Sequence, residues 1–66
     1  MATTRTIGRR IKRIRESEYW TCSRLAHRIG VSEDTLRNIE RGGRMPRPDE
    51  KLKIARILGI KVGDLV

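Results

Sequence analysis

The residues from Cys22 to Ile39 have the spacing of two short helices joined by a tight turn. Leu25, Ala26 and Ile29 form one apolar stripe, and Ala26 is small enough for a second helix to cross nearby. Gly30 follows that stripe, where a glycine can take the left-handed conformation that reverses the chain. The pattern predicts that the two helices meet at Ala26, Gly30, Val31, Leu36 and Ile39.

The second helix is predicted to begin at Ser32 or Glu33 and to end near Arg41, closed by Gly42. Ser32 is a preferred N-cap, and acidic residues next to it favour the positive end of the helix. Successive residues of a helix are about 100° apart, so one face of this helix can pack on the core while the other faces outward. The presented face is predicted to carry Glu33, Asp34, Arg37, Asn38 and Arg41, and the packed face Thr35, Leu36, Ile39 and Glu40.

Three further helical segments complete an all-α chain with no strand signal. A helix from about Thr4 to Glu18 carries a stripe of isoleucines, and Pro48 suits the first turn of a helix that ends near Leu58. A last turn over 62–65 lacks a good cap, so we expect it to be frayed or supported by a partner. The apolar residues expected to form a dimer interface near the chain end are Ile60, Val62, Leu65 and Val66.

Composition restricts the function. The 66 residues allow one domain, 1–66, whose core leaves little room for a deep substrate pocket. Sixteen Lys and Arg residues against eight Asp and Glu residues give a net charge of +8, which is typical of a protein that binds polyanions. The single cysteine excludes an internal disulfide, and we expect a cytoplasmic protein with neither a signal peptide nor a membrane span.

The same composition argues against catalysis. One histidine and one cysteine cannot supply a nucleophile, a base and an orienting group, so we predict that the chain is not an enzyme and has no small-molecule substrate. Cys22 and His27 are five residues apart with no further ligand near them, which does not make a zinc site. No metal or other cofactor is expected.

Five segments in order resemble the Xre/Cro-type, lambda-repressor-like family of helix-turn-helix DNA-binding domains, and the resemblance extends from Ile7 to Leu65. They are IKRIRE (11–16), the run TxxxLAxxxGVS (21–32), TLRNIERG (35–42), Pro46 and LKIARILGI (52–60). The resemblance implies a compact five-helix domain with a central helix-turn-helix. It also implies a transcription regulator, most often a repressor, that binds a palindromic operator in double-stranded DNA as a homodimer. Such a protein works at the nucleoid of a prokaryotic cell or a phage-infected host.

The resemblance also implies which residues face DNA. Bases would be read by the outer face of the second helix of the motif, at Glu33, Asp34, Arg37 and Asn38. Asn38 suits an adenine and Arg37 a guanine. Phosphates would be held by the amides of Cys22 and Ser23 and by arginines, and the family commonly has a glutamine at the position of Cys22. The arginines are Arg41, Arg44 and Arg47 near the following loop, with Arg24, Arg28 and Arg9 as secondary contacts.

A buried ion pair is expected between Arg15 and Glu40. Arg15 lies at the edge of the isoleucine stripe, an unusual place for a cation unless a partner is present, and Glu40 lies on the packed face of its own helix. The family often pairs an arginine and a glutamate at these two positions. We therefore predict that the pair joins the first helix to the second helix of the motif.

Several alternatives stay open. The helix that carries Glu33 and Arg37 could be an ordinary solvated helix with an ion pair one turn apart. If it faces DNA, Glu33 and Asp34 could accept from cytosine or could restrain Arg37 by ion pairing, and otherwise they could indicate a helix adapted to something other than DNA. The last account corresponds to a protein-interaction module, such as an antitoxin or a coactivator-like adaptor. Trp20 is expected to pack on the core rather than to stack on a base. Cys22 is expected to be a half-buried spectator, with a redox role as the alternative.

Overall fold

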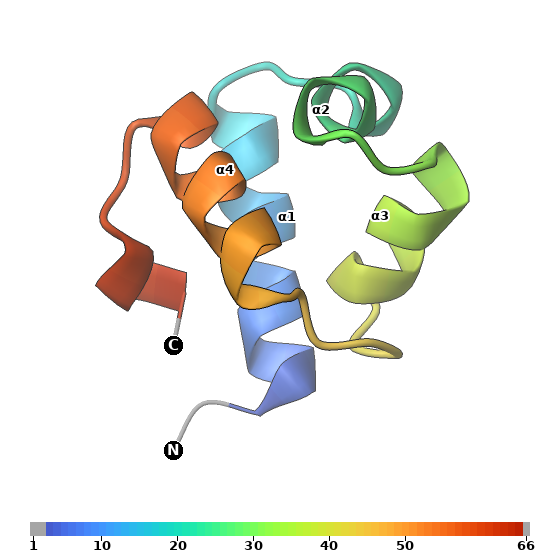
Figure 1. Cartoon of the computed structure of the whole chain (residues 1–66), viewed down its shortest axis with the longest axis vertical. Helices are drawn as coiled ribbons and strands as arrows, with labels where there is room; N and C mark the ends of the chain where they lie inside the picture. The colour runs from blue at the N-terminus through green and yellow to red at the C-terminus, as the bar shows by residue number, and fades with distance from the viewer. Residues whose placement is uncertain (1–2, 66) are drawn as a thin grey trace.

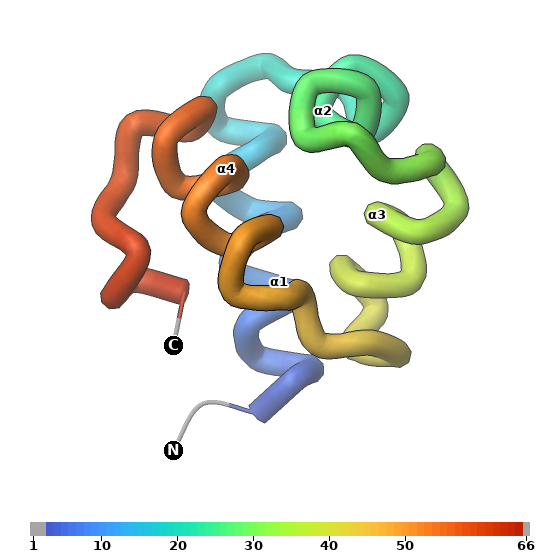
Figure 2. Tube along the Cα trace, viewed as in Figure 1, coloured from blue at the N-terminus to red at the C-terminus, as the bar shows by residue number. Residues whose placement is uncertain are grey.

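The computed structural model describes residues 3–65, which form four α-helices and a final 3-10 turn (Figures 1 and 2). The elements are α1 (Thr4–Ser17), α2 (Cys22–Ile29), α3 (Glu33–Glu40), α4 (Pro48–Leu58) and η1 (Val62–Leu65). No strand occurs among these residues. The expected all-helical fold is present, but the expected fifth helix is a single 3-10 turn. α1 and α3 also end one residue earlier than the sequence predicts.

Local capping explains the ends of α2 and α3. The hydroxyl of Thr21 accepts a hydrogen bond from the amide of Arg24 at 3.1 Å, and that of Ser32 accepts from the amide of Thr35 at 3.0 Å. Gly30 ends α2 in the left-handed conformation, with φ 80°. These short-range contacts fix the two helices of the motif and the turn between them.

The core lies where all the helices meet. α3 packs against α1 and α2, α4 packs against α2 and α1, and η1 packs against α4 and α1. The buried apolar side chains are those of Ile7, Ile11, Leu25, Ala26, Ile29, Leu36, Ile39, Ile54, Ala55, Leu58 and Leu65. Leu65 is fully buried in its own chain, so the expectation that the last turn needs a partner or frays is wrong.

Two glycines let α1 lie directly against the backbone of α3 and its following loop. A Cβ atom at Gly8 would collide with the carbonyl oxygen of Ile39, and one at Gly42 would lie 2.6 Å from the Cα of Arg5. Gly42 also has φ 84°, which favours glycine. The contact between these two segments is therefore set by backbone atoms as well as by side chains.

The connection between α1 and α2 is closed by hydrogen bonds back to α1. The amides of Tyr19 and Trp20 donate to the carbonyls of Glu16 and Arg15, each at 3.0 Å. Tyr19 takes the left-handed conformation, with φ 61°, and its side chain is 93% exposed. A tyrosine here therefore occupies a backbone position that favours glycine.

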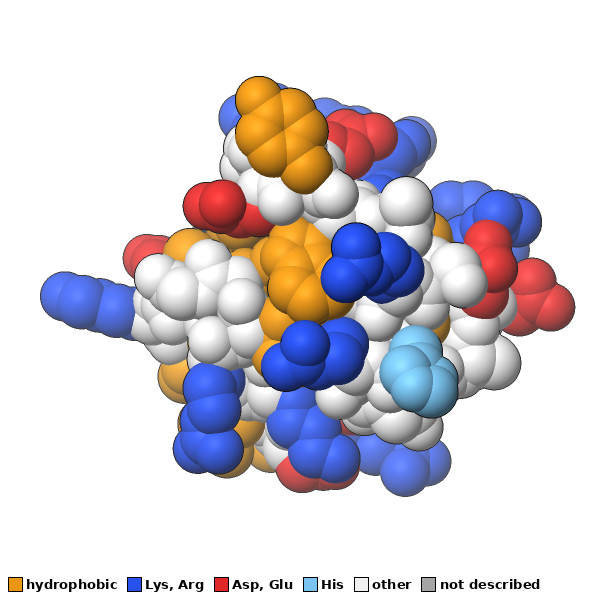
Figure 3. Space-filling model, turned by 90° about the horizontal axis from the view of Figure 1, so that it is seen from above, with side chains coloured by type: hydrophobic (Ala, Val, Ile, Leu, Met, Phe, Trp, Pro, Cys, Tyr) orange, Lys and Arg blue, Asp and Glu red, His pale blue; other side chains and the backbone are white. Residues whose placement is uncertain are grey.

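The surface is dominated by basic side chains. Figure 3 shows Lys and Arg side chains beside exposed hydrophobic surface on the face seen from above.

Within residues 3–65, no helix has the length and apolar character required to span a membrane.

Candidate nucleic-acid interface

The outer face of α3 projects from the turn that Gly30 and Ser32 build. Arg37 and Asp34 are exposed on this face, and Asn38 is half-buried beside the following loop. The packed face of the same helix carries Leu36 and Ile39, both fully buried. One face of α3 thus packs against the core and the opposite face is open to solvent, as the sequence predicts.

Glu33 and Arg37 form an ion pair one turn apart on α3. Their side chains are 39% and 61% exposed, so solvent screens the pair and its contribution to stability is small. The pair is the contact expected if the acidic residues restrain Arg37. It positions the guanidinium at the first turn of α3 and leaves most of its surface accessible.

Asn38 lies against the loop through Gly43. The amide of Gly43 donates to the carbonyl of Asn38 at 2.9 Å, which places the loop beside the end of α3. A Cβ atom at Gly43 would collide with the side-chain amide oxygen of Asn38. The missing side chain at Gly43 therefore leaves the space that the Asn38 amide occupies.

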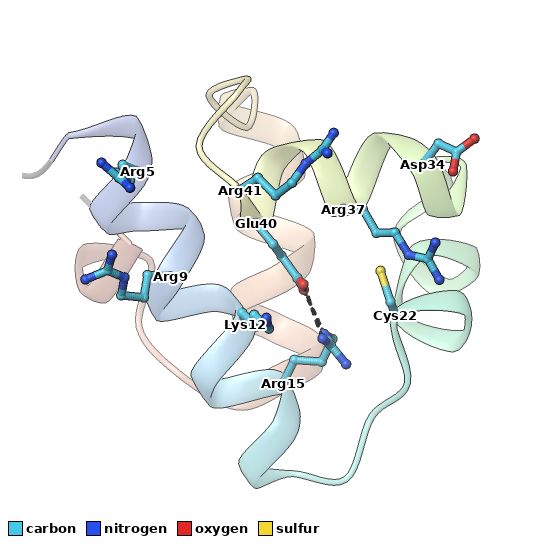
Figure 4. A pocket seen from close by; sticks show the side chains of 9 residues that line it. All are labelled: Arg5, Arg9, Lys12, Arg15, Cys22, Asp34, Arg37, Glu40 and Arg41. Atoms are coloured by element: carbon cyan, nitrogen blue, oxygen red, sulfur yellow. Dashed lines mark hydrogen bonds and ion pairs between the residues drawn. The ribbon is translucent and has the colours of Figure 1, made fainter.

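A basic groove separates α1 from the outer face of α3 (Figure 4). Its volume is about 790 Å³. Its lining residues are Arg5, Arg9, Lys12, Arg15, Cys22, Asp34, Arg37, Glu40 and Arg41. Six of these nine side chains are cationic and two are acidic, so the groove suits an anion.

The floor of this groove is the Arg15–Glu40 ion pair. Nε of Arg15 lies 2.7 Å from one carboxylate oxygen of Glu40, and Nη2 lies 3.2 Å from the other. Nη1 of Arg15 donates to the carbonyl of Trp20 at 2.7 Å. The hydrogen bond to Glu40 raises the pKa of Arg15 despite its burial. The expected pair is present, and it joins α1 to both α3 and the α1–α2 connection.

Cys22 stands at the start of α2, on the side of the groove near α3. Its thiol lies 3.8 Å from the carbonyl oxygen of Glu33 and is half-buried. Burial, the largest influence, raises the pKa of Cys22, which disfavours the thiolate. The half-buried position is the one that the sequence predicts for this residue. The first intrahelical bond of α2 comes from Leu25, which leaves the amides of Cys22 and Ser23 at the open end of the helix.

One of the predicted phosphate-binding arginines, Arg44 in the loop between α3 and α4, forms an ion pair within the chain. Arg44 donates to Glu50 at 3.0 Å, and Glu50 also accepts from the amide of Arg47 at 2.9 Å. Although burial favours the neutral acid, these bonds together lower the pKa of Glu50. Nη1 of Arg44 is buried with no hydrogen-bond partner among residues 3–65. Arg41 and Arg47, by contrast, are exposed.

Arg24 and Arg28 lie elsewhere, on the exposed side of α2. Their guanidinium carbons are 5.5 Å and 5.7 Å from the centre of the Trp20 ring. Trp20 itself packs against the core, as expected, and His27 is exposed. Neither arginine lines the groove between α1 and α3, whereas Arg9 does.

The residues expected at a dimer interface differ in their exposure. Leu65 is fully buried in the core of its own chain. Ile60 is half-buried against the core, while Val62 is exposed. Val66 lies outside the described residues.

Sequence reasoning missed three contacts that shape the site. These are the Gly8 contact with α3, the Gly43 contact with Asn38, and the Arg44–Glu50 ion pair. A partial signal existed only for the last. Glu50 is the third residue of a helix that begins with Pro48, a position that predicts its bond to the N-cap amide of Arg47 but not its pair with Arg44. The described residues contain no cluster of acidic, histidine or cysteine side chains that could hold a metal ion.

Comparison with known proteins agrees with this geometry. The family model of the helix-turn-helix domain matches residues 6–66. The crystal structure of the clp gene regulator ClgR from C. glutamicum has the same fold, with a TM-score of 0.86 and 24% sequence identity over 94% of this chain and 80% of that one. Comparison with curated protein sequences gives no significant match. The chain belongs to the helix-turn-helix domain family, whose motif is formed here by α2 and α3.

Proposed function

We propose that this protein is a sequence-specific regulator of transcription that binds double-stranded DNA. The observation that carries the proposal is the position of α3. Its outer face is accessible and is flanked by the basic groove on the α1 side and by exposed loop arginines on the other. A helix of this width fits the major groove, where base edges carry sequence information.

Base recognition is assigned to the outer face of α3. Asn38 is suited to an adenine and Arg37 to a guanine, and each bidentate pair discriminates by about 1–3 kcal/mol. Glu33 acts on Arg37 through their ion pair, and the exposed Asp34 would accept from a cytosine. The Glu33–Arg37 contact supports restraint of the reading arginine without excluding DNA from this face.

Phosphate contacts are assigned to both sides of α3. On the groove side, the open amides of Cys22 and Ser23 and the cations of α1, including Arg9, can follow one strand. On the loop side, Arg47 can follow the other strand, and Arg41, which lines both the groove and the hollow beside Asn38, lies between the two sides. Arg44 contributes charge near that strand while remaining bonded to Glu50. With about six such contacts, a rise in salt concentration from about 50 to about 200 mM would lower the affinity for DNA roughly a thousandfold.

We further propose a homodimer that acts as a repressor on a two-fold operator in the cytoplasm. A dimer places two reading helices about 34 Å apart on one side of the duplex. Ile60, Val62 and Val66 remain the candidates for its interface. This assembly would account for the selectivity that one small domain cannot supply.

Selection from a randomised duplex library at near-physiological salt tests the proposal. A palindromic consensus is expected, and its half-site spacing would give the geometry of the dimer. A consensus without symmetry would retain sequence-specific DNA binding and reject the two-fold dimer. Salt-sensitive binding without enrichment of any sequence would reject base recognition by α3.

That last outcome would favour a protein-interaction module with the same fold. The observation that favours such a module is the acidic first turn of α3, where Glu33 and Asp34 would repel phosphates and attract a basic partner. Such an adaptor would bind DNA weakly and without sequence preference. A parallel selection with the Glu33→Gln/Asp34→Asn variant separates the two, because a DNA reader keeps or changes its consensus whereas an adaptor still has none.

A further inference from the structure

Another pocket lies on the exposed side of α2 and shares only Ser23 with the residues assigned to DNA in the proposed function. It has a volume of about 360 Å³ and is lined by Trp20, Ser23, Arg24, His27 and Arg28. None of these residues lines the groove between α1 and α3 or the hollow beside Asn38. Figure 3 shows basic side chains bordering hydrophobic surface on the side of the molecule that carries α2.

The indole that lines this pocket belongs to a residue held by the core and by its backbone. Trp20 is half-buried and packs against the core, and its carbonyl accepts a hydrogen bond from Arg15 at 2.7 Å. Its amide donates to the carbonyl of Arg15 at 3.0 Å. The ring therefore presents a firm apolar base to the pocket.

Two guanidinium groups lie over this ring and are free to bind an anion. Arg24 and Arg28 are one helical turn apart, and their Cζ atoms lie 5.5 Å and 5.7 Å from the ring centre. Within residues 3–65 neither forms an ion pair with a carboxylate. A cation–π contact with an indole does not use the N–H groups of a guanidinium, so both groups remain available as paired donors.

We propose that this pocket binds an acidic peptide segment of a partner protein. Carboxylates of the segment would pair with Arg24 and Arg28, and an apolar side chain between them would contact Trp20. The pocket is small and is lined in part by the Trp20 ring, which suits a few residues of a peptide. A nucleic-acid backbone instead follows an extended basic groove, which this protein has on another face.

Fluorescence of Trp20 provides the measurement, because it is the only tryptophan in the chain. The probe is a short synthetic peptide in which glutamates flank a single leucine, titrated into the whole protein at near-physiological salt. Saturable binding with a change in emission is expected. Arg24→Gln/Arg28→Gln should weaken binding at least about tenfold, since both paired donors are lost.

The matched control is Lys53→Gln/Arg56→Gln, which removes the same charge from exposed positions on α4 outside the three pockets described. This variant should bind the peptide nearly as the parent does. Equal weakening by both variants would overturn the proposal, because net charge alone would then explain binding. Absence of saturable binding by the parent protein would overturn it as well.

DNA affinity, measured on the same variants, tests the competing assignment of these arginines. If the pocket serves a peptide, the α2 and α4 variants should lose DNA affinity to the same small extent. A selective loss for Arg24→Gln/Arg28→Gln would instead assign the two arginines to phosphates and overturn the proposal. Arg24→Lys/Arg28→Lys keeps the charge, so weak peptide binding by this variant would support paired donors over simple attraction.

Discussion

Arg15 and Glu40 are joined by two hydrogen bonds, of 2.7 Å and 3.2 Å, between side chains that are 10% and 6% exposed. The pair connects the first helix of the chain to the helix that we assign to base reading. It is the buried counterpart of the exposed Glu33–Arg37 pair, and the two should differ sharply in their contribution to stability.

Removal of one member of the buried pair should destabilise the fold strongly. Arg15→Met leaves the Glu40 carboxylate buried without its partner, so we expect the free energy of unfolding to fall by about 3–5 kcal/mol. Urea denaturation measures the change. Arg37→Met, which breaks only the exposed pair, should cost less than about 0.5 kcal/mol, and comparable losses in both variants would contradict this account.

Asn38→Ala should remove preference for one base. The expected loss is about 1–3 kcal/mol of discrimination between the preferred duplex and one substituted at a single position, measured by competition binding. Arg47→Ala is the control, because loss of a phosphate contact should weaken all duplexes alike. A uniform loss for Asn38→Ala would remove this residue from the reading set.

Gly43→Ala should act through Asn38. The added methyl group collides with the amide oxygen of Asn38 and should displace that side chain, so the same base preference is expected to fall. The double variant with Asn38→Ala should lose no more discrimination than Asn38→Ala alone. Gly63→Ala, where a Cβ atom meets open space, is the control; additive losses in the double variant would show that Gly43 acts independently.

Gly8→Ala should lower stability even though alanine favours a helix. Helix propensity alone would predict a gain of about 0.5–1 kcal/mol. The collision with the backbone of α3 should outweigh that gain and give a net loss of about 1–3 kcal/mol, measured by thermal or urea unfolding. Arg13→Ala, at an exposed position on the same helix, should change stability by less than about 0.5 kcal/mol.

Stability at acid pH should depend on Glu50. Because its pKa is lowered in the folded protein, ionised Glu50 contributes fully above the ordinary value of 4.5, and the contribution is lost as the pH falls through the folded-state pKa. Glu50→Gln should therefore lower stability at neutral pH and flatten its decline between about pH 5 and about pH 3. Asp49→Asn, an exposed neighbour, is the control; the same flattening there would contradict the assignment.

The sequence predicts the parts of this structure that depend on neighbouring residues. Thr21, Gly30 and Ser32 set the ends of α2 and α3 through bonds within a few positions, so those ends could be located from local pattern. The Arg15–Glu40 pair spans 25 positions, yet a cation on an apolar stripe and the family resemblance together indicated it.

Contacts without such signals were missed. The burial of Leu65 depends on how η1 packs against α1 and α4, which no local pattern encodes. Gly8 reads as an ordinary helical glycine until the backbone of α3 is seen beside it. The assignments to bases, phosphates and a partner remain predictions, because they concern molecules outside this chain.

The backbone contacts at Gly8 and Gly42 have a consequence for the reprogramming of specificity. Because main-chain atoms of α1 abut α3 and its loop directly, the angle at which α3 projects is largely independent of its outward-facing side chains. Those side chains can be exchanged as a set while the packing of α3 against α1 stays the same. This domain should therefore serve as a scaffold on which new recognition surfaces are selected without redesign of its interior.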